Sequence, residues 1–290
     1  MVSLTTPTVL HPGRCVGHIQ CLWRYPVKSM LGECLRTLSI EQRGVVGDRS
    51  HALWDVERGK VASAKNPRTW ADLLRFQARY GAEPVSGQAL PPVVVEGPFQ
   101  GADGPQDIVR SDDPQLEQRL STYFGRQLRL LNQPPEGASL EHYWPAVDGQ
   151  EFQEVTNELR LPTGTFFDAC PIHALTNATL NHYRQLEPQL DFSVERFRPN
   201  ILIHSESAST GFVEEAWVGG VLAIGDAVRL RVDRDCPRCV ITTLPQGPLP
   251  EEMDILRATA RHNKLVAGIR LSVLETGTVT VGDPLHWWPS

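Results

Sequence analysis

The residues best suited to chemistry are two cysteines in a Cys-Pro-Arg-Cys sequence, at positions 236 and 239. Just before them, residues 228–232 alternate apolar and charged side chains, the pattern of a half-buried strand. Just after them, residues 240–242 are β-branched and predict a second strand. The two thiols are therefore expected on a short connection between strands, where a rigid scaffold exposes reactive groups.

A pair of cysteines at this spacing has four chemical interpretations. Half of a four-thiolate zinc site would need a second close pair of ligands, which the scattered cysteines at positions 15, 21, 34 and 170 do not form. A redox dithiol normally places its first cysteine at a helix N-terminus, whereas a strand is predicted here. Buried structural thiols are common, although a Pro-Arg insert beside them would be unusual. A thiolate ligand for a soft metal is the most specific interpretation.

Composition indicates the redox compartment of the protein and the partners that it excludes. The formal net charge of -6, from 28 basic and 34 acidic residues, argues against a general nucleic-acid surface, so any anion site must be local. Six irregularly spaced cysteines indicate a reducing compartment rather than a disulfide framework. Residues 1–14 resemble a loose leader without signal-peptide features, and no apolar run approaches the roughly 20 residues of a membrane span. A cytoplasmic protein without membrane or nucleic-acid partners is predicted.

The whole chain predicts a mostly β fold with a few helices. Strand patterns recur without regular strand–helix alternation, and the absence of a glycine-rich phosphate loop argues against a Rossmann-type enzyme. Two similar stretches, AIGDAVRL at 223–230 and TVGDPLHW at 280–287, predict matching turns of a small antiparallel barrel. Residues 132–164 are rich in Pro, Gly and acidic side chains, which predicts a domain boundary at Asn132 followed by a long connecting loop.

Three cations occupy positions that could present them to a ligand. Lys28 follows the end of a strand closed by Pro26, and Arg49 follows a Gly-Asp turn. Arg198 precedes a proline, which is expected to hold it in an extended conformation. Each could also be an ordinary solvated surface residue.

These residues fall within a recognisable pattern of five motifs. They are YPVKS at 25–29, GDR at 47–49, FRPN at 197–200, PRCVITT at 237–243 and VGDP at 281–284. In this order they closely resemble MOSC-domain proteins that also carry a MOSC N-terminal β-barrel domain, as in mitochondrial amidoxime reducing components and their bacterial relatives. The resemblance covers residues 16–286. It implies a MOSC N-terminal β-barrel domain at residues 16–131 and a MOSC domain at residues 132–288.

The resemblance also implies a molybdenum cofactor, molybdopterin with its metal, between the two parts. Cys239 matches the catalytic cysteine that ligates molybdenum, and Arg238 lies beside it. The positions that match those holding the pterin and its phosphate are Lys28, Arg49, Arg198 and Asn200. Asp168 matches the first residue of an Asp-Thr-Ser-Pro motif, whose two hydroxyl residues are replaced here by Ala169 and Cys170. An arginine fork suits a phosphate, and the nearby arginine should favour an ionised thiol.

The function that this resemblance implies is a molybdenum-dependent oxidoreductase that reduces N-hydroxylated compounds, such as amidoximes, hydroxylamines or N-hydroxylated bases. The sequence has no dinucleotide fingerprint and no second cysteine cluster, so electrons are expected from a separate ferredoxin-, flavin- or cytochrome-type reductase. The alternative is a non-enzymatic carrier of the molybdenum cofactor or its sulfurated form. Pyridoxal phosphate, which cofactor sulfurases use on another domain, is not expected to bind here.

Overall fold

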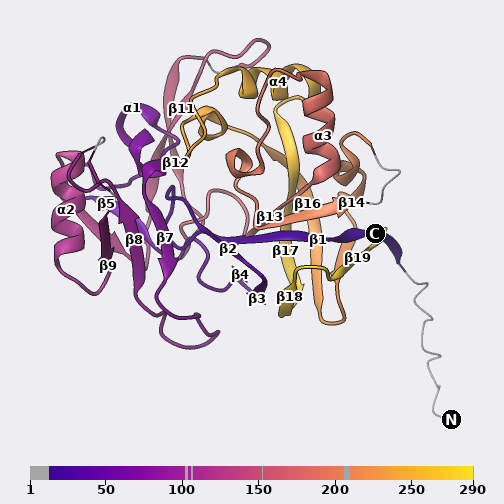
Figure 1. Ribbon diagram of the computed structural model, residues 1–290, viewed down its shortest axis with the longest axis horizontal. Helices are drawn as coiled ribbons and strands as arrows, with labels where there is room; N and C mark the ends of the chain where they lie inside the picture. Colours follow the sequence, from indigo (N-terminus) through magenta and orange to yellow (C-terminus); the bar gives the residue numbers. More distant parts are fainter. Residues whose placement is uncertain (1–12, 102–103, 106, 152, 206–209, 290) are drawn as a thin grey trace.

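The computed structural model describes residues 13–101, 104–105, 107–151, 153–205 and 210–289. Most of the predicted leader, residues 1–12, lies outside the described residues. Within the described ranges the chain forms nineteen β-strands and four α-helices (Figure 1). This confirms the predicted mostly β fold. None of the helices in this part of the chain is long and apolar enough to cross a bilayer.

The elements have the following bounds. The strands are β1 Arg14–Arg24, β2 Glu33–Leu35, β3 Thr37–Glu41, β4 Gly44–Val45, β5 Ala52–Asp55, β6 Lys60–Val61, β7 Gln77–Tyr80, β8 Val93–Gly97, β9 Asp107–Arg110, β10 Leu128–Leu131, β11 Ser139–Trp144, β12 Val155–Arg160, β13 Ile172–Thr176, β14 Ile201–Ser205, β15 Val221–Ile224, β16 Val228–Pro237, β17 Val266–Glu275, β18 Gly277–Thr280 and β19 Pro284–Trp288. The α-helices are α1 Pro67–Trp70, α2 Gln115–Phe124, α3 Asn177–Leu186 and α4 Asp254–Asn263. The 3₁₀ helices are η1 Ala71–Arg75, η2 Val194–Phe197, η3 Val213–Trp217 and η4 Val240–Thr243.

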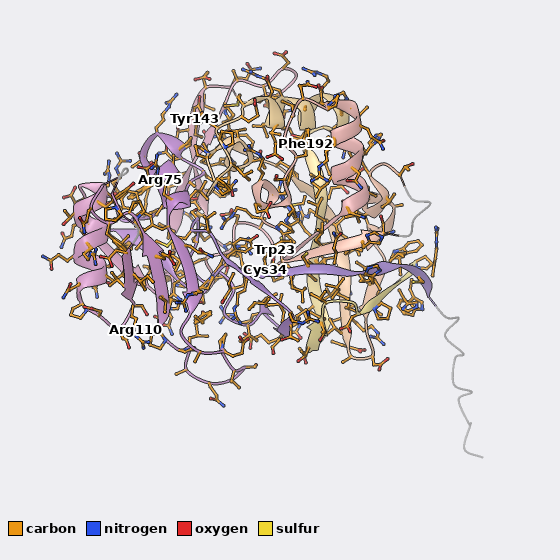
Figure 2. All side chains as sticks on the ribbon, viewed as in Figure 1. Trp23, Cys34, Arg75, Arg110, Tyr143 and Phe192 are labelled. Atoms are coloured by element: carbon orange, nitrogen blue, oxygen red, sulfur yellow. The ribbon has the colours of Figure 1, made fainter. Side chains whose placement is uncertain are left out.

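Seven strands close into a barrel. Their order is β14-β13-β17-β16-β15-β19-β1, and β1 pairs with β14 to complete the ring. All of these pairings are antiparallel except that between β13 and β14. Strand β2 continues the sheet beyond β1, with Trp23 opposite Cys34 near the centre of the molecule (Figure 2). The barrel is therefore built from both ends of the chain.

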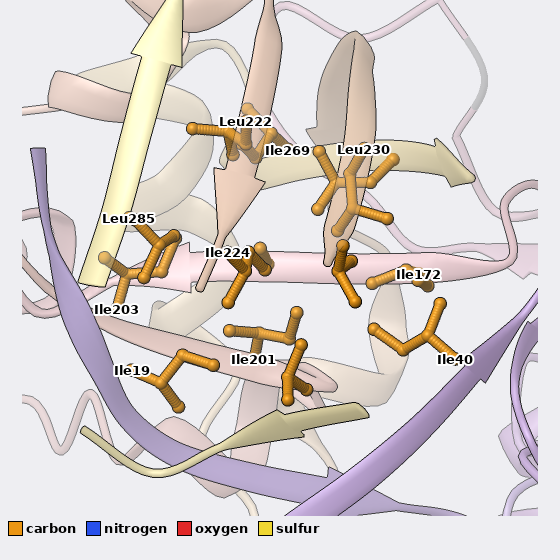
Figure 3. Packing of buried hydrophobic residues seen from close by; sticks show 14 of the residues in the cluster. Ile19, Ile40, Ile172, Ile201, Ile203, Leu222, Ile224, Leu230, Ile269 and Leu285 are labelled. Atoms are coloured by element: carbon orange, nitrogen blue, oxygen red, sulfur yellow. The ribbon is translucent and has the colours of Figure 1, made fainter. Parts of the chain in front are cut away.

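The barrel interior is filled by branched aliphatic side chains. The predicted alternation in β16 is confirmed, because Val228, Leu230 and Val232 are fully buried while the residues between them are more exposed. Isoleucines from other strands meet them in the same core, including Ile19, Ile201 and Ile269 in Figure 3. Such a closed, well-packed barrel gives the loops at its ends a rigid support.

The second part of the molecule packs beside the barrel around a separate core. Strands β7, β8 and β9 form one sheet and β10, β5 and β6 another, with α1 and α2 against them (Figure 1). Phe76 is fully buried in this core. The predicted boundary between residues 131 and 132 stays a prediction. Strand β1 precedes that boundary in the chain and nevertheless lies in the barrel.

The predicted long loop over residues 132–164 is wrong in one respect, because β11 and β12 form an antiparallel hairpin within it. Leu140 and His142 are buried on one face of β11, and Leu140 packs with Phe166. This short alternation was obscured by the acidic, proline-rich residues on either side. The backbone N–H of Tyr143 donates to the Lys65 carbonyl at 2.8 Å, which attaches the hairpin to the loop before α1.

Acid should destabilise the fold through His51. This side chain is 7% exposed, and burial lowers its pKa from 6.5 to about 4. Below pH 6.5 the unfolded chain binds a proton that the folded chain does not, so stability present above pH 6.5 is lost as the pH falls towards 4. The shift corresponds to about 3 kcal/mol. We expect His51→Gln to reduce the loss of unfolding free energy between pH 7 and 4.5, measured by urea denaturation.

The matched control is His18→Gln, because His18 is exposed on β1. It should leave the unfolding free energy at pH 7 close to that of the wild type. A His51→Gln protein that loses as much unfolding free energy on acidification as the wild type would show that His51 titrates equally in the folded and unfolded states.

Candidate functional site

The cysteine pair lies at the end of barrel strand β16. Cys236 is within the strand and Cys239 follows it, but residues 240–243 form the 3₁₀ helix η4 rather than the predicted strand. The carbonyl of Cys239 accepts hydrogen bonds from the backbone N–H and the hydroxyl of Thr242, at 3.1 and 3.0 Å. A threonine hydroxyl that bonds back to the chain in this way competes with strand pairing, which explains why β propensity failed here.

All the side chains predicted to serve a cofactor line one cavity of about 140 Å³. The seven residues are Lys28, Arg49, Asp168, Arg198, Asn200, Arg238 and Cys239. They come from distant segments: the loops after β1 and β4, the loop before β13, the connection from η2 to β14, and the end of β16. The structure thus brings together residues that are far apart in the sequence.

The cavity is strongly cationic. Sequence reasoning missed Lys65 and Arg270, which join the four predicted cations in its lining, whereas Asp168 is the one carboxylate among the lining residues. Lys65 lies in the loop after β6, as Lys28 lies in the loop after β1. This position after a strand is the sequence signal that could have predicted Lys65 as a site residue. Arg270 lies inside β17 and carries no such signal. This acidic protein therefore concentrates positive charge at one place.

Asp168 connects the two lysines of the cavity. Lys28 is 5% exposed, and its Nζ donates to Asp168 Oδ1 at 2.5 Å and to the Phe166 carbonyl at 2.7 Å. Lys65 Nζ lies 3.5 Å from the other carboxylate oxygen. Burial would raise the pKa of Asp168, but Lys28 and Lys65 hold it well below its ordinary value. Asp168 is therefore an anion that orients two cations rather than a proton donor.

The two arginines that match the phosphate-binding motif lie against the same tyrosine. The guanidinium carbons of Arg49 and Arg198 are 4.5 and 4.4 Å from the centroid of the Tyr25 ring. Arg49 is paired with Asp48 at 2.5 Å. Arg198 has no such carboxylate: its Nη2 donates to the Met30 carbonyl at 2.6 Å, and its buried Nη1 has no hydrogen-bond partner among the described residues.

The backbone of the cavity is strained. Among the described residues, six other than glycine have positive φ, and Ser29, Arg49 and Arg198 are three of them, all in this lining. The predicted extended conformation of Arg198 is wrong, because its φ is 52°. Its backbone N–H donates to the Glu195 carbonyl and so ends the 3₁₀ helix η2. Left-handed conformations cost about 1–2 kcal/mol in such residues and gather at functional sites.

Arg196 holds the two ends of the site together. It is fully buried, and its guanidinium donates to the Asp191, Thr242 and Pro250 carbonyls. It thereby links η2, which precedes Arg198, to η4, which follows Cys239.

Cys236 has chemistry that the sequence did not predict. Arg238, expected to favour ionisation of Cys239, instead donates from Nη1 to Cys236 Sγ at 3.0 Å. Burial would raise the pKa of Cys236, but His173 and Arg238 lower it well below its ordinary value. Burial and the neighbouring Cys236 raise the pKa of Cys170 to about 12. Arg238 is therefore bonded to Cys236 rather than to Cys239, which faces the cavity.

These residues fit an anionic, metal-bearing cofactor. A buried guanidinium N–H without a partner is costly, and a phosphate oxygen would satisfy it. Cys239 is half-buried in the same lining. Among the described residues, no three His, Cys, Asp or Glu side chains are grouped to hold a metal ion. A soft metal at Cys239 would thus need ligands that a cofactor brings with it.

The structure combines a closed barrel with a cationic cavity that contains a thiol. Two family matches identify the class of protein to which it belongs. The MOSC N-terminal beta barrel domain matches residues 16–83, and the MOSC domain matches residues 163–286. The chain is a MOSC-domain protein with the MOSC N-terminal β-barrel domain. MOSC domains are associated with binding of the molybdenum cofactor.

The comparison with solved structures finds the crystal structure of APC1665, the YuaD protein from Bacillus subtilis. It is 12% identical, with a TM-score of 0.47, and the match covers 96% of this chain and 98% of that chain. YiiM from Geobacillus stearothermophilus is 14% identical with a TM-score of 0.32, over 41% of this chain and 54% of that chain. No curated protein matches the chain.

Proposed function

We propose that this protein is a cytoplasmic, molybdenum-cofactor-dependent oxidoreductase that reduces N-hydroxylated compounds such as amidoximes, hydroxylamines and N-hydroxylated bases. The observation that carries the proposal is the cavity itself. It joins Cys239 to six cations, one of which, Arg198, has a buried N–H with no hydrogen-bond partner in the described part of the chain.

Each residue has a role in this proposal. Cys239 supplies the thiolate ligand of the metal, a soft donor for a metal held by the sulfurs of a pterin. Arg49, Arg198 and Lys28 bind the phosphate, and Asn200 orients Arg49, since its Oδ1 accepts from Arg49 at 3.4 Å. When bound, the cofactor supplies the two-electron redox chemistry, while the protein provides binding, orientation and access.

Electrons are proposed to come from a separate reductase of ferredoxin, flavin or cytochrome type. Reduction of an N–O bond requires two electrons, and the sequence contains no nicotinamide-binding fingerprint and no cluster of cysteines for an iron–sulfur centre. The protein is therefore expected to work with an exchangeable donor.

The test is to express the chain in a host that makes the cofactor and then to measure molybdenum, pterin and turnover. We expect about one molybdenum per chain by elemental analysis, pterin fluorescence after denaturation, and reduction of a hydroxylamine with reduced viologen but only poorly with a nicotinamide donor. The rate should follow molybdenum content across preparations. Molybdenum-replete protein that reduces no N-hydroxylated compound with any donor would instead support a cofactor carrier.

A further inference from the structure

The proposed function gives no role to Arg270, one of the six cations that line the cavity. Arg270 lies in β17 between Ile269 and Leu271, which are both buried in the barrel core (Figure 3). Because successive side chains of a strand point to opposite faces, Arg270 points out of the barrel, where it lines the same cavity as Cys239. Arg270 is only half-buried. It can therefore contact a molecule that binds in this cavity.

The other five cations of the lining have partners or an assigned role. Three of them are assigned to the phosphate above. Lys65 Nζ lies 3.5 Å from Asp168, and Arg238 donates from Nη1 to Cys236 Sγ at 3.0 Å. Within the described ranges of the chain, the Arg270 side chain forms no hydrogen bond and no ion pair. Of the cations in this lining, Arg270 is thus the one that has neither a partner nor a role.

The residues opposite Arg270 on the two adjacent strands cannot neutralise its charge. In the strand register it lies opposite His173 of β13 and opposite Arg234 of β16. His173 Nε2 lies 3.3 Å from Arg238 Nη1 and 3.3 Å from the Ala267 carbonyl oxygen, so this imidazole contacts other groups. Like charges directly opposite each other on neighbouring strands are destabilising. An anion bound at Arg270 would relieve its repulsion with Arg234.

The charge of Arg270 acts on the interior of the cavity. Burial and the neighbouring Cys236 raise the pKa of Cys170 to about 12, and the charge of Arg270 opposes this rise. Both cysteines line the cavity, so the guanidinium lies close to its open space. Asp168 is the one carboxylate among the lining residues, and it already contacts two lysines. A cavity with this excess of positive charge attracts anions and raises their local concentration.

We propose that Arg270 binds a carboxylate group of the substrate, so that the protein prefers N-hydroxylated compounds that carry a carboxylate. A guanidinium can donate two parallel hydrogen bonds to a carboxylate, and the single negative charge of that group balances its own charge. The N–O group of the same molecule lies toward Cys239, which lines the same cavity. The inference rests on the proposed function and narrows its substrate class.

The experiment uses the molybdenum-loaded protein and two amidoximes that differ in charge at one position. The probes are 4-carboxybenzamidoxime and 4-carbamoylbenzamidoxime, a neutral compound of nearly the same shape. Their binding is measured by calorimetry without an electron donor, and kcat and KM are measured with reduced viologen. We expect the wild-type protein to bind the carboxylate probe about 10-fold more tightly, since one charge-assisted hydrogen bond has at least this effect. The preference should decrease at high salt concentration, which screens charges.

Two variants and a control test whether Arg270 causes this preference. Arg270→Met should remove it, by weakening the binding of the carboxylate probe much more than that of the carbamoyl probe, with molybdenum content unchanged. Arg270→Lys keeps the positive charge and should restore part of the preference. Arg257→Met is the matched control, because Arg257 is exposed on α4 and paired with Asp254, and it should match the wild type.

The outcomes separate this inference from the proposed function. A wild-type protein without the preference, or a preference that persists in Arg270→Met, would overturn the assignment of Arg270 to a substrate carboxylate. Loss of molybdenum from Arg270→Met would also overturn it, because Arg270 would then bind the cofactor. Molybdenum-loaded wild-type protein that reduces neither amidoxime would refute the proposed function instead, and the calorimetric comparison would still decide the role of Arg270.

Discussion

Replacing Cys239 by serine is expected to remove molybdenum and reductase activity together. Serine has nearly the same shape, but its neutral hydroxyl is a much harder donor than a thiolate and binds a soft metal poorly. Even loss of a group that merely orients a metal ligand costs about 10–100-fold in affinity or activity. Loss of the ligand itself should therefore exceed about 100-fold in the rate, and elemental analysis should find little bound metal.

The matched control is Cys236→Ser, three residues earlier in the same loop. Cys236 Sγ accepts a hydrogen bond from Arg238 Nη1, and a serine oxygen can accept it too. We expect this variant to keep most of its molybdenum and activity. Equal losses in the two variants, with unchanged thermal unfolding, would show that the cysteines act as a dithiol or as part of a zinc site.

The parts of the site that the sequence predicts are those that form motifs of several residues. Arg198 and Asn200 lie in one such motif and Cys239 in another, and each motif has a local structural reason. Cys239 follows a strand with a clear alternation of apolar and charged residues, and Arg198 follows the 3₁₀ helix η2, which ends at Phe197. Their meeting in one cavity could be inferred only from the resemblance, since no local pattern fixes contacts between segments so far apart.

The parts that sequence reasoning missed depend on tertiary contacts. Lys65 looks like a surface lysine until the β11–β12 hairpin bonds to its carbonyl. His142 lies in a stretch whose acidic and proline-rich neighbours predicted a loop. Cys236 looked like the spare partner of Cys239, and only the packing of His173 and Arg238 around it lowers its pKa. In each case a neighbour distant in the sequence determines the chemistry.

The N-terminal strand shows the same limit at the level of the fold. The alternation in β1 predicts a strand, but strand propensity does not say which sheet it joins. It pairs with β14 and β19, so closure of the C-terminal barrel requires residues from the other end of the chain. The same strand leads into the loop that carries Lys28, whereas Arg49 reaches the cavity from the loop after β4.

The second large effect is expected for Arg198→Met, which should weaken cofactor retention without lowering the stability of the cofactor-free protein. Burial lowers the pKa of Arg198 to about 10, with Arg49 acting in the same direction. This shift from 12.5 corresponds to about 3 kcal/mol against the charged form in the cofactor-free protein. Arg198→Met removes that penalty. It also loses one hydrogen bond to the Met30 carbonyl, worth about 1–3 kcal/mol, and the contact with the Tyr25 ring, worth about 0.5–2 kcal/mol. The free energy of unfolding of the cofactor-free protein should therefore change little.

Cofactor retention should fall in the same variant, because the methionine cannot bind a phosphate. Loss of a charge-assisted contact costs about 1.5–3 kcal/mol, which weakens binding about 10- to 100-fold. Elemental analysis after extensive dialysis measures the retained molybdenum, and urea denaturation measures the stability of the cofactor-free form. Arg257→Met is the control, since this arginine is exposed on α4 and paired with Asp254. Replacement of a purely structural arginine would lower the unfolding free energy of the cofactor-free protein. Replacement of a surface cation would change neither this free energy nor the retained molybdenum. Only substitution of a buried cation that binds the anionic cofactor should weaken cofactor retention without lowering the stability of the cofactor-free protein.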